Sequence, residues 1–151
     1  MSRNYSSPRH QAREIAFQFI YRFDQETPMT QVYEEFTRHA EHFECPKESF
    51  DFAARLAETT LKQLIAIDDM IVKHAQNWRI ERMNSVDKSI LRMGAAELLF
   101  FKDVPASVTL DELVELAKTF GEAETASFVN GILDPISREP MAVNGKVPSD
   151  S

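Results

Sequence analysis

The stretch PRHQAREIAFQFIY, residues Pro8–Tyr21, carries the pattern that decides the fold. Pro8 is suited to the first turn of a helix, and Ser7 before it is suited to the N-cap. The apolar residues that follow recur at intervals of three and four, which is the period of one helix face; they are Ala12, Ile15, Ala16, Phe19, Ile20 and Phe23. The sequence therefore predicts an amphipathic helix from Pro8 to about Gln25, with Arg9, Arg13 and Arg22 largely on its wettable faces.

The same period returns along the rest of the chain, and it indicates an all-α protein. Further helical stripes are Val32–Phe43, Phe50–Ile65, Ile67–Trp78, Val86–Phe101, Leu110–Phe120 and Thr125–Asp134. We expect a kink or turn near residues 66–68, a cap at Asn84 or Ser85, and Gly121 at a left-handed C-cap position. Breaks at Pro28 and residues 78–83 suggest two packed groups of helices rather than two independent domains.

Composition supports a helical domain. Hydrophobic residues make up 43% of the 151-residue chain, with eleven Phe and only four Gly, which disfavours a β-sandwich or barrel. Cys45 is the only cysteine, so no intramolecular disulfide forms, as suits a reducing cytoplasm. No apolar run reaches the length of a membrane span. The predicted organisation is a flexible N-terminus at residues 1–7, a helical domain at 8–136 and a flexible tail at 137–151.

Charge is distributed unevenly along the chain. Residues 1–22 hold four arginines and one acid, Glu14, and so carry +3. The whole chain carries −7, so residues 23–151 carry −10, the difference between −7 and +3. A basic edge on an acidic protein favours binding of a polyanion such as RNA at that edge. The alternative is a solvated helix start with ordinary surface arginines.

Two other groups of residues have the side-chain types of catalytic or metal sites. Glu35, His39 and His42 are spaced to share a helix face near Cys45, but they lack the zinc-hydrolase pattern, and a surface cluster is favoured. Glu97 lies partly on an apolar face, where we expect it to accept hydrogen bonds. No phosphate-binding loop or nucleophile motif is present, so the sequence predicts no enzyme, no cofactor and no metal.

Asn130-Gly131 is a strong hairpin signal when read locally. Its flanks, ASFV and ILDP, do not alternate in polarity, and the neighbouring segments are helical. We therefore expect a helix in which Gly131 lets another backbone approach closely, at a propensity cost of about 1 kcal/mol.

Four segments together resemble the NusB family of bacterial transcription antitermination factors, over roughly residues 8–136. They are PRHQAREIAFQFIY (Pro8–Tyr21), VDKSILRMGAAEL (Val86–Leu98), DVPASVTLDELVELAKTFG (Asp103–Gly121) and SFVNGILD (Ser127–Asp134). The resemblance implies an all-α compact bundle of about seven helices in two three-helix-like groups. It also implies cytoplasmic binding of boxA RNA from ribosomal RNA leaders together with NusE, a small-subunit ribosomal protein. NusA, NusG and RNA polymerase would complete the complex, and a homodimer is a further possibility.

The resemblance also assigns site residues. The RNA-binding positions it implies are Arg9, His10, Arg13, Tyr21, Glu124 and Phe128, and the positions on the NusE face are Asp87 and Lys88. The family's arginine-rich run falls here on Arg9, His10 and Gln11, of which only the first is arginine. Fewer fixed charges predict fewer neutralised phosphates and a shallower salt dependence.

Two alternatives to an RNA-binding antitermination factor follow from the same segments. The reduced arginine run favours a protein-interaction adapter that binds NusE with weak or altered RNA specificity. The same helical module also precedes a methyltransferase domain in certain ribosomal RNA cytosine methyltransferases, but a cofactor loop and a catalytic cysteine environment are missing from this sequence.

Overall fold

The computed structural model describes residues 7–140, which divide into two compact units on either side of the Lys62–Gln63 bond. Within those residues the chain forms seven α-helices and two short 3-10 helices, with no strand. The all-α prediction and the helix count are therefore confirmed. The boundary between the groups lies at Gln63 rather than at residues 78–83, and the predicted flexible segments lie largely outside the described residues.

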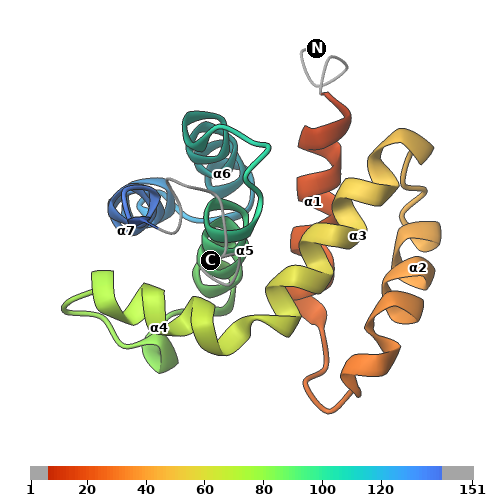
Figure 1. Ribbon diagram of the computed structural model, residues 1–151, viewed down its shortest axis with the longest axis horizontal. Coiled ribbons are helices and arrows are strands. Elements are labelled where there is room, and N and C mark those ends of the chain that lie inside the picture. Colours follow the sequence, from red (N-terminus) through yellow and green to blue (C-terminus); the bar gives the residue numbers. More distant parts are fainter. Residues whose placement is uncertain (1–6, 141–151) are drawn as a thin grey trace. The chain divides into compact units, whose positions relative to one another are not determined.

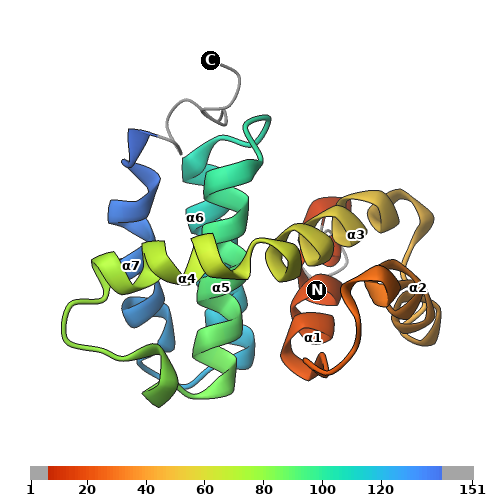
Figure 2. The same cartoon turned by 60° about the horizontal axis from the view of Figure 1, so that its bottom comes forward.

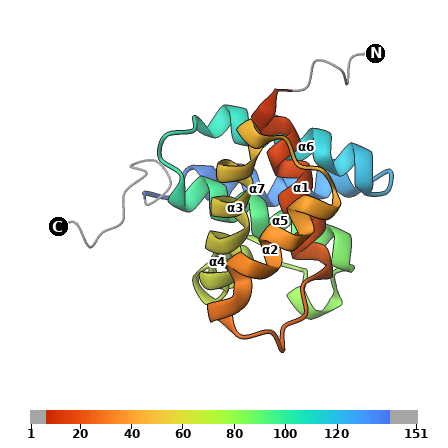
Figure 3. The same ribbon diagram turned by 90° about the vertical axis from the view of Figure 1, so that its right-hand side faces the viewer.

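The first unit packs two long helices side by side, with a third helix against them (Figure 1; Figure 3). Its elements are α1 (Pro8–Arg22), η2 (Met29–Gln31), α2 (Val32–His42) and α3 (Lys47–Lys62). In α1, Ser7 is the N-cap as expected, and its hydroxyl accepts from the His10 amide at 3.0 Å. The helix ends at Arg22, because Phe23 is already extended.

The core of the first unit is aromatic. Phe19 and Phe36 are buried, and their rings meet edge to face with centroids 5.2 Å apart. Each such ring contributes about 1.5–3 kcal/mol by leaving water. The apolar stripe read from the sequence of α1 is thus the face that packs on α2 and α3.

Arg13 departs from the expectation that it lies on a wettable face. Its side chain is only 2% exposed, and its guanidinium carbon lies 5.1 Å from the centre of the buried Phe52 ring on α3. A guanidinium is weakly hydrated and stacks on aromatic faces, so it can be buried at lower cost than an ammonium. Arg13 therefore contributes to the packing of α1 on α3.

The second unit is built around α5, which is buried along most of its length. Its elements are α4 (Leu64–His74), η3 (Ile80–Arg82), α5 (Ser85–Phe100), α6 (Ala106–Phe120) and α7 (Thr125–Ser137). Figure 2 shows α4 crossing α5 and α7, and both helices contact it. The Asn84 side chain caps α5 by accepting from the Asp87 amide at 2.8 Å, as the sequence predicts.

Two ionic contacts fix the position of α4 in this unit. The Arg92 guanidinium on α5 donates to both carboxylate oxygens of Asp68, at 2.9 and 2.8 Å. At the other end, Lys73 and His74 both contact the Glu139 carboxylate just after α7. Hydrogen bonds from His74 and then Lys73 lower the pKa of Glu139, so it stays charged in neutral solution.

Glu97 is buried in the second unit, with 1% of its surface exposed. Its carboxylate accepts a hydrogen bond from the Thr109 hydroxyl at 2.7 Å, from the first turns of α6. The expectation that Glu97 accepts from a neighbouring helix is confirmed. A buried acceptor left without its donor would cost roughly 1–3 kcal/mol, so this bond specifies how α5 and α6 meet.

The surroundings of Gly121 and Gly131 differ from those expected from the sequence. Gly121 is extended (φ −100°, ψ −168°) rather than left-handed, and a Cβ there would lie 2.5 Å from Cβ of Thr125. Close packing, rather than a positive φ, accounts for glycine at this position. Gly131 lies in α7 as expected, but a Cβ added at this residue would have nothing within 4 Å, so the close approach of another backbone is absent among the described residues.

The helix α7 continues past Pro135 to Ser137, although the sequence predicts its end at Pro135. Proline lacks the amide that would bond the carbonyl of Gly131. Gly131 is exposed, so water can satisfy that carbonyl, and the helix continues for one more half turn. In the described part of the chain, no helix is both long and apolar enough to cross a bilayer.

Candidate nucleic-acid interface

The start of α1 presents the basic edge in the first unit. Arg9 is exposed, and its guanidinium carbon lies 4.4 Å from the centre of the Phe52 ring. The Ser49 hydroxyl on α3 donates to the Pro8 carbonyl at 2.8 Å and fixes the first turn. Arg9 and Arg13 share one helix face, as their spacing predicts, and both lie against Phe52. The ring supports the Arg9 guanidinium, and the Arg9 residue as a whole is exposed.

His10 and Tyr21 are the other predicted contacts on α1. The His10 ring nitrogen lies 3.4 Å from the Glu14 carboxylate one turn later, so an acid accompanies the imidazole. Tyr21 is 51% exposed, and its ring is tilted by 32° against Phe17 at 6.0 Å. Phe17 supports one side of the tyrosine ring, which leaves a supported aromatic surface available for a stacked base.

A pocket of about 400 Å³ in the second unit brings together three of the predicted residues. Asp87 at the start of α5 lies with Glu124 and Phe128 from the start of α7. The lining is completed by Trp78, Arg82, Met83, Asn84, Glu122, Thr125 and Ser127. Lys88 is half-buried and does not line the pocket. The residues assigned by resemblance to RNA and to a protein partner thus share one pocket.

The polar side of this pocket is fixed by the Thr125 hydroxyl. That hydroxyl donates to the Asp87 carboxylate at 2.9 Å and accepts from the Glu122 amide at 2.9 Å. The bonds join the first turns of α5 and α7 through one side chain. Three carboxylates and one arginine make this lining unfavourable for a phosphate, but suitable for accepting N–H bonds from a base or a basic peptide.

Trp78 is a candidate contact that the sequence interpretation missed. The helical stripe was expected to continue to Trp78, but α4 ends at His74 and the tryptophan lies in the following loop. Its ring is 57% exposed and meets Phe128 edge to face at 5.2 Å. The available sequence signal was that Trp78 is the only tryptophan in the chain, and its exposed ring beside a second aromatic residue makes it a candidate binding surface.

The cluster considered as a metal site, Glu35, His39 and His42, is not arranged as a set of metal ligands. His39 is buried with one ring nitrogen, Nε2, 3.1 Å from the Ile15 carbonyl and the other, Nδ1, 3.1 Å from the Arg22 guanidinium. The carbonyl can only accept, so Nε2 donates to it, and Nδ1 accepts from Arg22. Within residues 7–140, no group of three or more His, Cys, Asp or Glu is arranged to hold a metal ion.

The buried imidazole of His39 predicts a pH dependence of stability. Burial lowers the pKa of His39; the Ile15 hydrogen bond raises it in part, and the Arg22 and His42 charges lower it further. The folded state therefore prefers the neutral ring. Above the ordinary pKa of 6.5 this contribution is fully present, and it is lost as the pH falls below 6.5 towards the lowered folded pKa.

We expect the unfolding free energy to fall between pH 7 and pH 5 by at most about 1.4 kcal/mol per pH unit from this group. Urea titrations at several pH values measure it. The variant His39→Gln, which cannot titrate, should show a flatter profile, whereas His42→Gln, which removes only the smallest contribution to the lowered pKa of His39, should keep most of the wild-type slope. Equal slopes in all three proteins would contradict the assignment.

These features define a class of protein. It is a small all-α protein with a cationic helix start in one unit and an aromatic pocket rich in hydrogen-bond acceptors in the other. Such a protein is suited to bind a polyanion with accessible bases. The family model described as the NusB family matches residues 10–138, and the chain belongs to that family.

Relatives extend over most of the chain. The transcription antitermination protein NusB of Symbiobacterium thermophilum is 41% identical over 136 residues, covering 86% of this chain and 89% of its own. The protein of the same name from Desulfitobacterium hafniense is 37% identical over 128 residues, with 85% and 86% covered. These lengths show that the similarity includes both compact units.

Solved structures give the same result. T. maritima NusB superposes with a TM-score of 0.77 at 32% identity, covering 89% of this chain and 93% of its own. A chain in the structure described as antitermination factors NusB and NusE in complex with dsRNA has a TM-score of 0.76 at 30% identity, with 87% and 96% covered. The all-α, NusB-like fold predicted from the sequence is confirmed.

Proposed function

We propose that this protein is a transcription antitermination factor that binds boxA-type RNA of ribosomal RNA leaders together with NusE. The observation that carries this proposal is the relative of the same fold solved with both NusE and RNA. The presence of RNA in that complex favours this function over an adapter that binds NusE alone. The action proposed is non-covalent, with no catalytic step and no cofactor.

The start of α1 and the pocket of the second unit would bind different chemical groups of the RNA. Arg9 and His10 would bind phosphate oxygens, while Arg13, buried beneath, would add its positive field and hold α1 on α3. Tyr21 would offer its supported ring to an unstacked base, as single-stranded RNA allows. The number of phosphates neutralised at α1 stays small, because Glu14 accompanies His10 and Arg13 is not at the surface.

The pocket of the second unit would take a base rather than a phosphate. Phe128 and Trp78 supply aromatic surface, and Glu124 can accept hydrogen bonds from base N–H groups. Asp87 and Lys88 lie at the start of α5, where we propose that NusE docks. Because Asp87 is also part of the pocket, NusE and RNA would meet there, and each would add contacts for the other.

In the cell the complex would include NusA, NusG and RNA polymerase in the cytoplasm and support processive transcription of ribosomal RNA. A homodimer that conceals the RNA surface is a further state that we propose for the free protein. Light scattering over a range of protein concentrations, with and without RNA, measures it.

The first test is binding of fluorescently labelled boxA RNA at several salt concentrations, with and without NusE. We expect tighter binding with NusE, and a slope of log affinity against log salt that falls by about 0.7 in Arg9→Ala, since one phosphate contact is lost. Lys47→Ala, which removes one exposed positive charge from α3, is the matched control. Binding of NusE without any binding of RNA would instead support the adapter.

A further inference from the structure

An open pocket of about 360 Å³ lies in the first unit, at the last turn of α2 and the last residue of α1. It is lined by Arg22, Glu35, Arg38, His39, His42 and Phe43. None of these residues belongs to the set implied by the family resemblance. The pocket therefore raises a separate question of what this chain binds there.

The Arg22 guanidinium is held in place without being neutralised. It donates to Nδ1 of His39 at 3.1 Å, and His39 is in turn fixed by the Ile15 carbonyl. Burial keeps the imidazole neutral, and within residues 7–140 no carboxylate pairs with Arg22. A guanidinium has five N–H donors, so this contact leaves others for a ligand while it limits the motion of the side chain.

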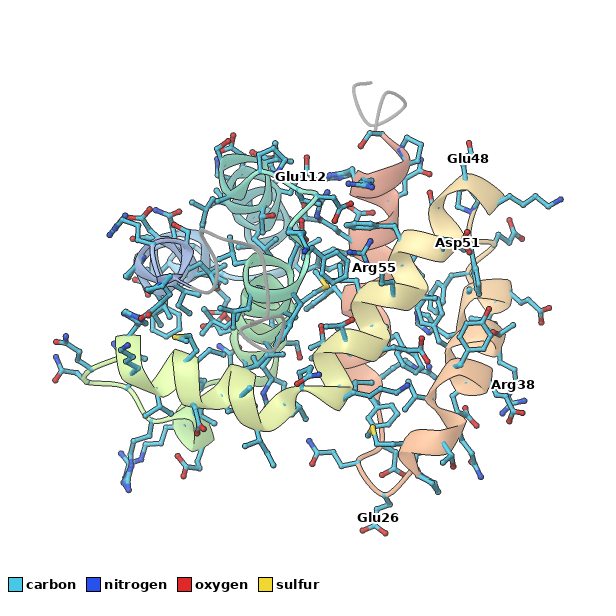
Figure 4. The ribbon with its side chains drawn as sticks, viewed as in Figure 1. Glu26, Arg38, Glu48, Asp51, Arg55 and Glu112 are labelled. Atoms are coloured by element: carbon cyan, nitrogen blue, oxygen red, sulfur yellow. The ribbon has the colours of Figure 1, made fainter. Side chains whose placement is uncertain are left out.

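The remaining charges set the kind of anion that fits. Arg38 lies on the outer side of α2 (Figure 4), where it pairs with Glu35 at 2.7 Å, so these two residues cancel in formal charge. Arg22 then leaves a net charge of about +1, while the carboxyl ends of α1 and α2 carry partial negative charge. This balance suits a group with one negative charge, such as a phosphodiester, better than a dianion.

Aromatic surface lies directly beside this cation. The Phe43 ring is 42% exposed and packs against His39 at 4.6 Å and His42 at 4.9 Å, the latter edge to face. These neighbours fix the ring while leaving part of it open. An oriented guanidinium beside a fixed, open aromatic ring is the combination that binds one nucleotide of a single strand without reading its sequence.

We propose that this pocket binds a phosphodiester of single-stranded RNA and stacks the adjoining base on Phe43. The site rests on the proposed RNA-binding function and extends it. Arg9 and Arg22 lie at opposite ends of α1, about 20 Å apart along its axis. The step of thirteen residues between them also places Arg22 roughly 140° around the helix axis from Arg9, on the side that faces α2. A strand bound at the basic edge would therefore have to run along α1 and cross over it to reach the pocket, which flanking nucleotides outside boxA would occupy.

The test compares boxA RNA with the same RNA extended by several nucleotides at its 5′ or 3′ end. For the wild-type protein, we expect one of the two extensions to raise affinity by about tenfold to a hundredfold, the effect of one base stacked on an aromatic side chain. Arg22→Gln and Phe43→Ala should abolish that gain and leave binding of unextended boxA unchanged. In Arg22→Gln the salt slope for the extended RNA should also fall by about 0.7. Arg22→Lys, which keeps the charge without the fork, should retain only part of the gain.

The controls separate a binding role from a structural one. Thermal unfolding of each variant shows whether the His39 contact was needed for folding, and Lys47→Ala removes one positive charge elsewhere in the unit. A gain from extension that persists in both Arg22→Gln and Phe43→Ala overturns the site. Absence of any gain in the wild-type protein also overturns it. In contrast, failure of the wild-type protein to bind boxA overturns the proposed function.

The dinucleotide ApA, which contains one phosphodiester, and dimethyl phosphate, which has the same charge without a base, serve as small probes of the same chemistry. Competition by the dinucleotide, but not by dimethyl phosphate, against the extended RNA is the result expected if base and phosphate are bound together. Equal competition by both probes would contradict the role of Phe43 in stacking.

Discussion

Phe128→Ala is expected to weaken binding of boxA RNA by about tenfold to a hundredfold, because one base stacked on an aromatic side chain contributes roughly 1–3 kcal/mol. Phe128 is half-buried and meets Trp78 edge to face, so its removal also takes away the contact that supports the Trp78 ring in the pocket. Fluorescence anisotropy with labelled RNA measures the affinity. Phe128→Leu, which keeps apolar bulk without an aromatic face, should lose most of the same affinity.

Trp78 supplies an independent readout of the same contact. It is the only tryptophan in the chain, and it is 57% exposed beside Phe128, so RNA entering the pocket should change its fluorescence. Tyr33→Ala removes an exposed aromatic residue that packs on Phe50 instead, and should leave RNA affinity unchanged. Loss of affinity in Tyr33→Ala equal to that in Phe128→Ala would show that the effect is structural.

The helices and most of the core follow from local sequence because their signal is periodic. The stripe from Ala12 to Ile20 becomes the buried face of α1, and Ser7 and Asn84 are caps because their side chains accept from nearby amides. Such features depend on residues three or four positions apart, which a single sequence shows directly.

The environment of a polar side chain depends on partners that are distant in sequence, and here the sequence was a weaker guide. Arg13 looks like a surface residue until Phe52, on α3, is placed against it. His39 belongs to a plausible metal cluster until its two ring nitrogens are seen to face Ile15 and Arg22. Neither contact leaves a periodic trace along the chain.

The candidate site shows the same division. The resemblance placed Asp87, Glu124 and Phe128 in segments separated along the chain, but the Thr125 hydroxyl that ties α7 to α5 explains why they line one pocket. Trp78 could not be assigned from periodicity, because its spacing fits the helical stripe that begins at Ile67, whereas α4 already ends at His74. Its contact with Phe128 depends on how the loop after α4 packs against α7, and local sequence does not show this.

Gly94→Val is the substitution expected to destabilise the fold most, lowering the unfolding free energy by about 1–3 kcal/mol or more. Gly94 lies in the buried part of α5, where a Cβ would be 2.5 Å from Cδ1 of Leu133 and 3.1 Å from Cγ of Leu113. Both leucines are fully buried in the second unit, so they cannot move into solvent to make room. The melting temperature should fall by roughly 2–4 °C per kcal/mol for a chain of this length.

Gly131→Ala is the matched control, because it changes a glycine of α7 at which an added Cβ has nothing within 4 Å. It should raise stability by about 0.5–1 kcal/mol, since alanine has the higher helix propensity. Leu133→Ala should be destabilising alone but should offset part of the cost of Gly94→Val in the double variant, because it removes the side chain that clashes. Strictly additive effects of the two changes would mean that Gly94 is required for some reason other than contact with Leu133.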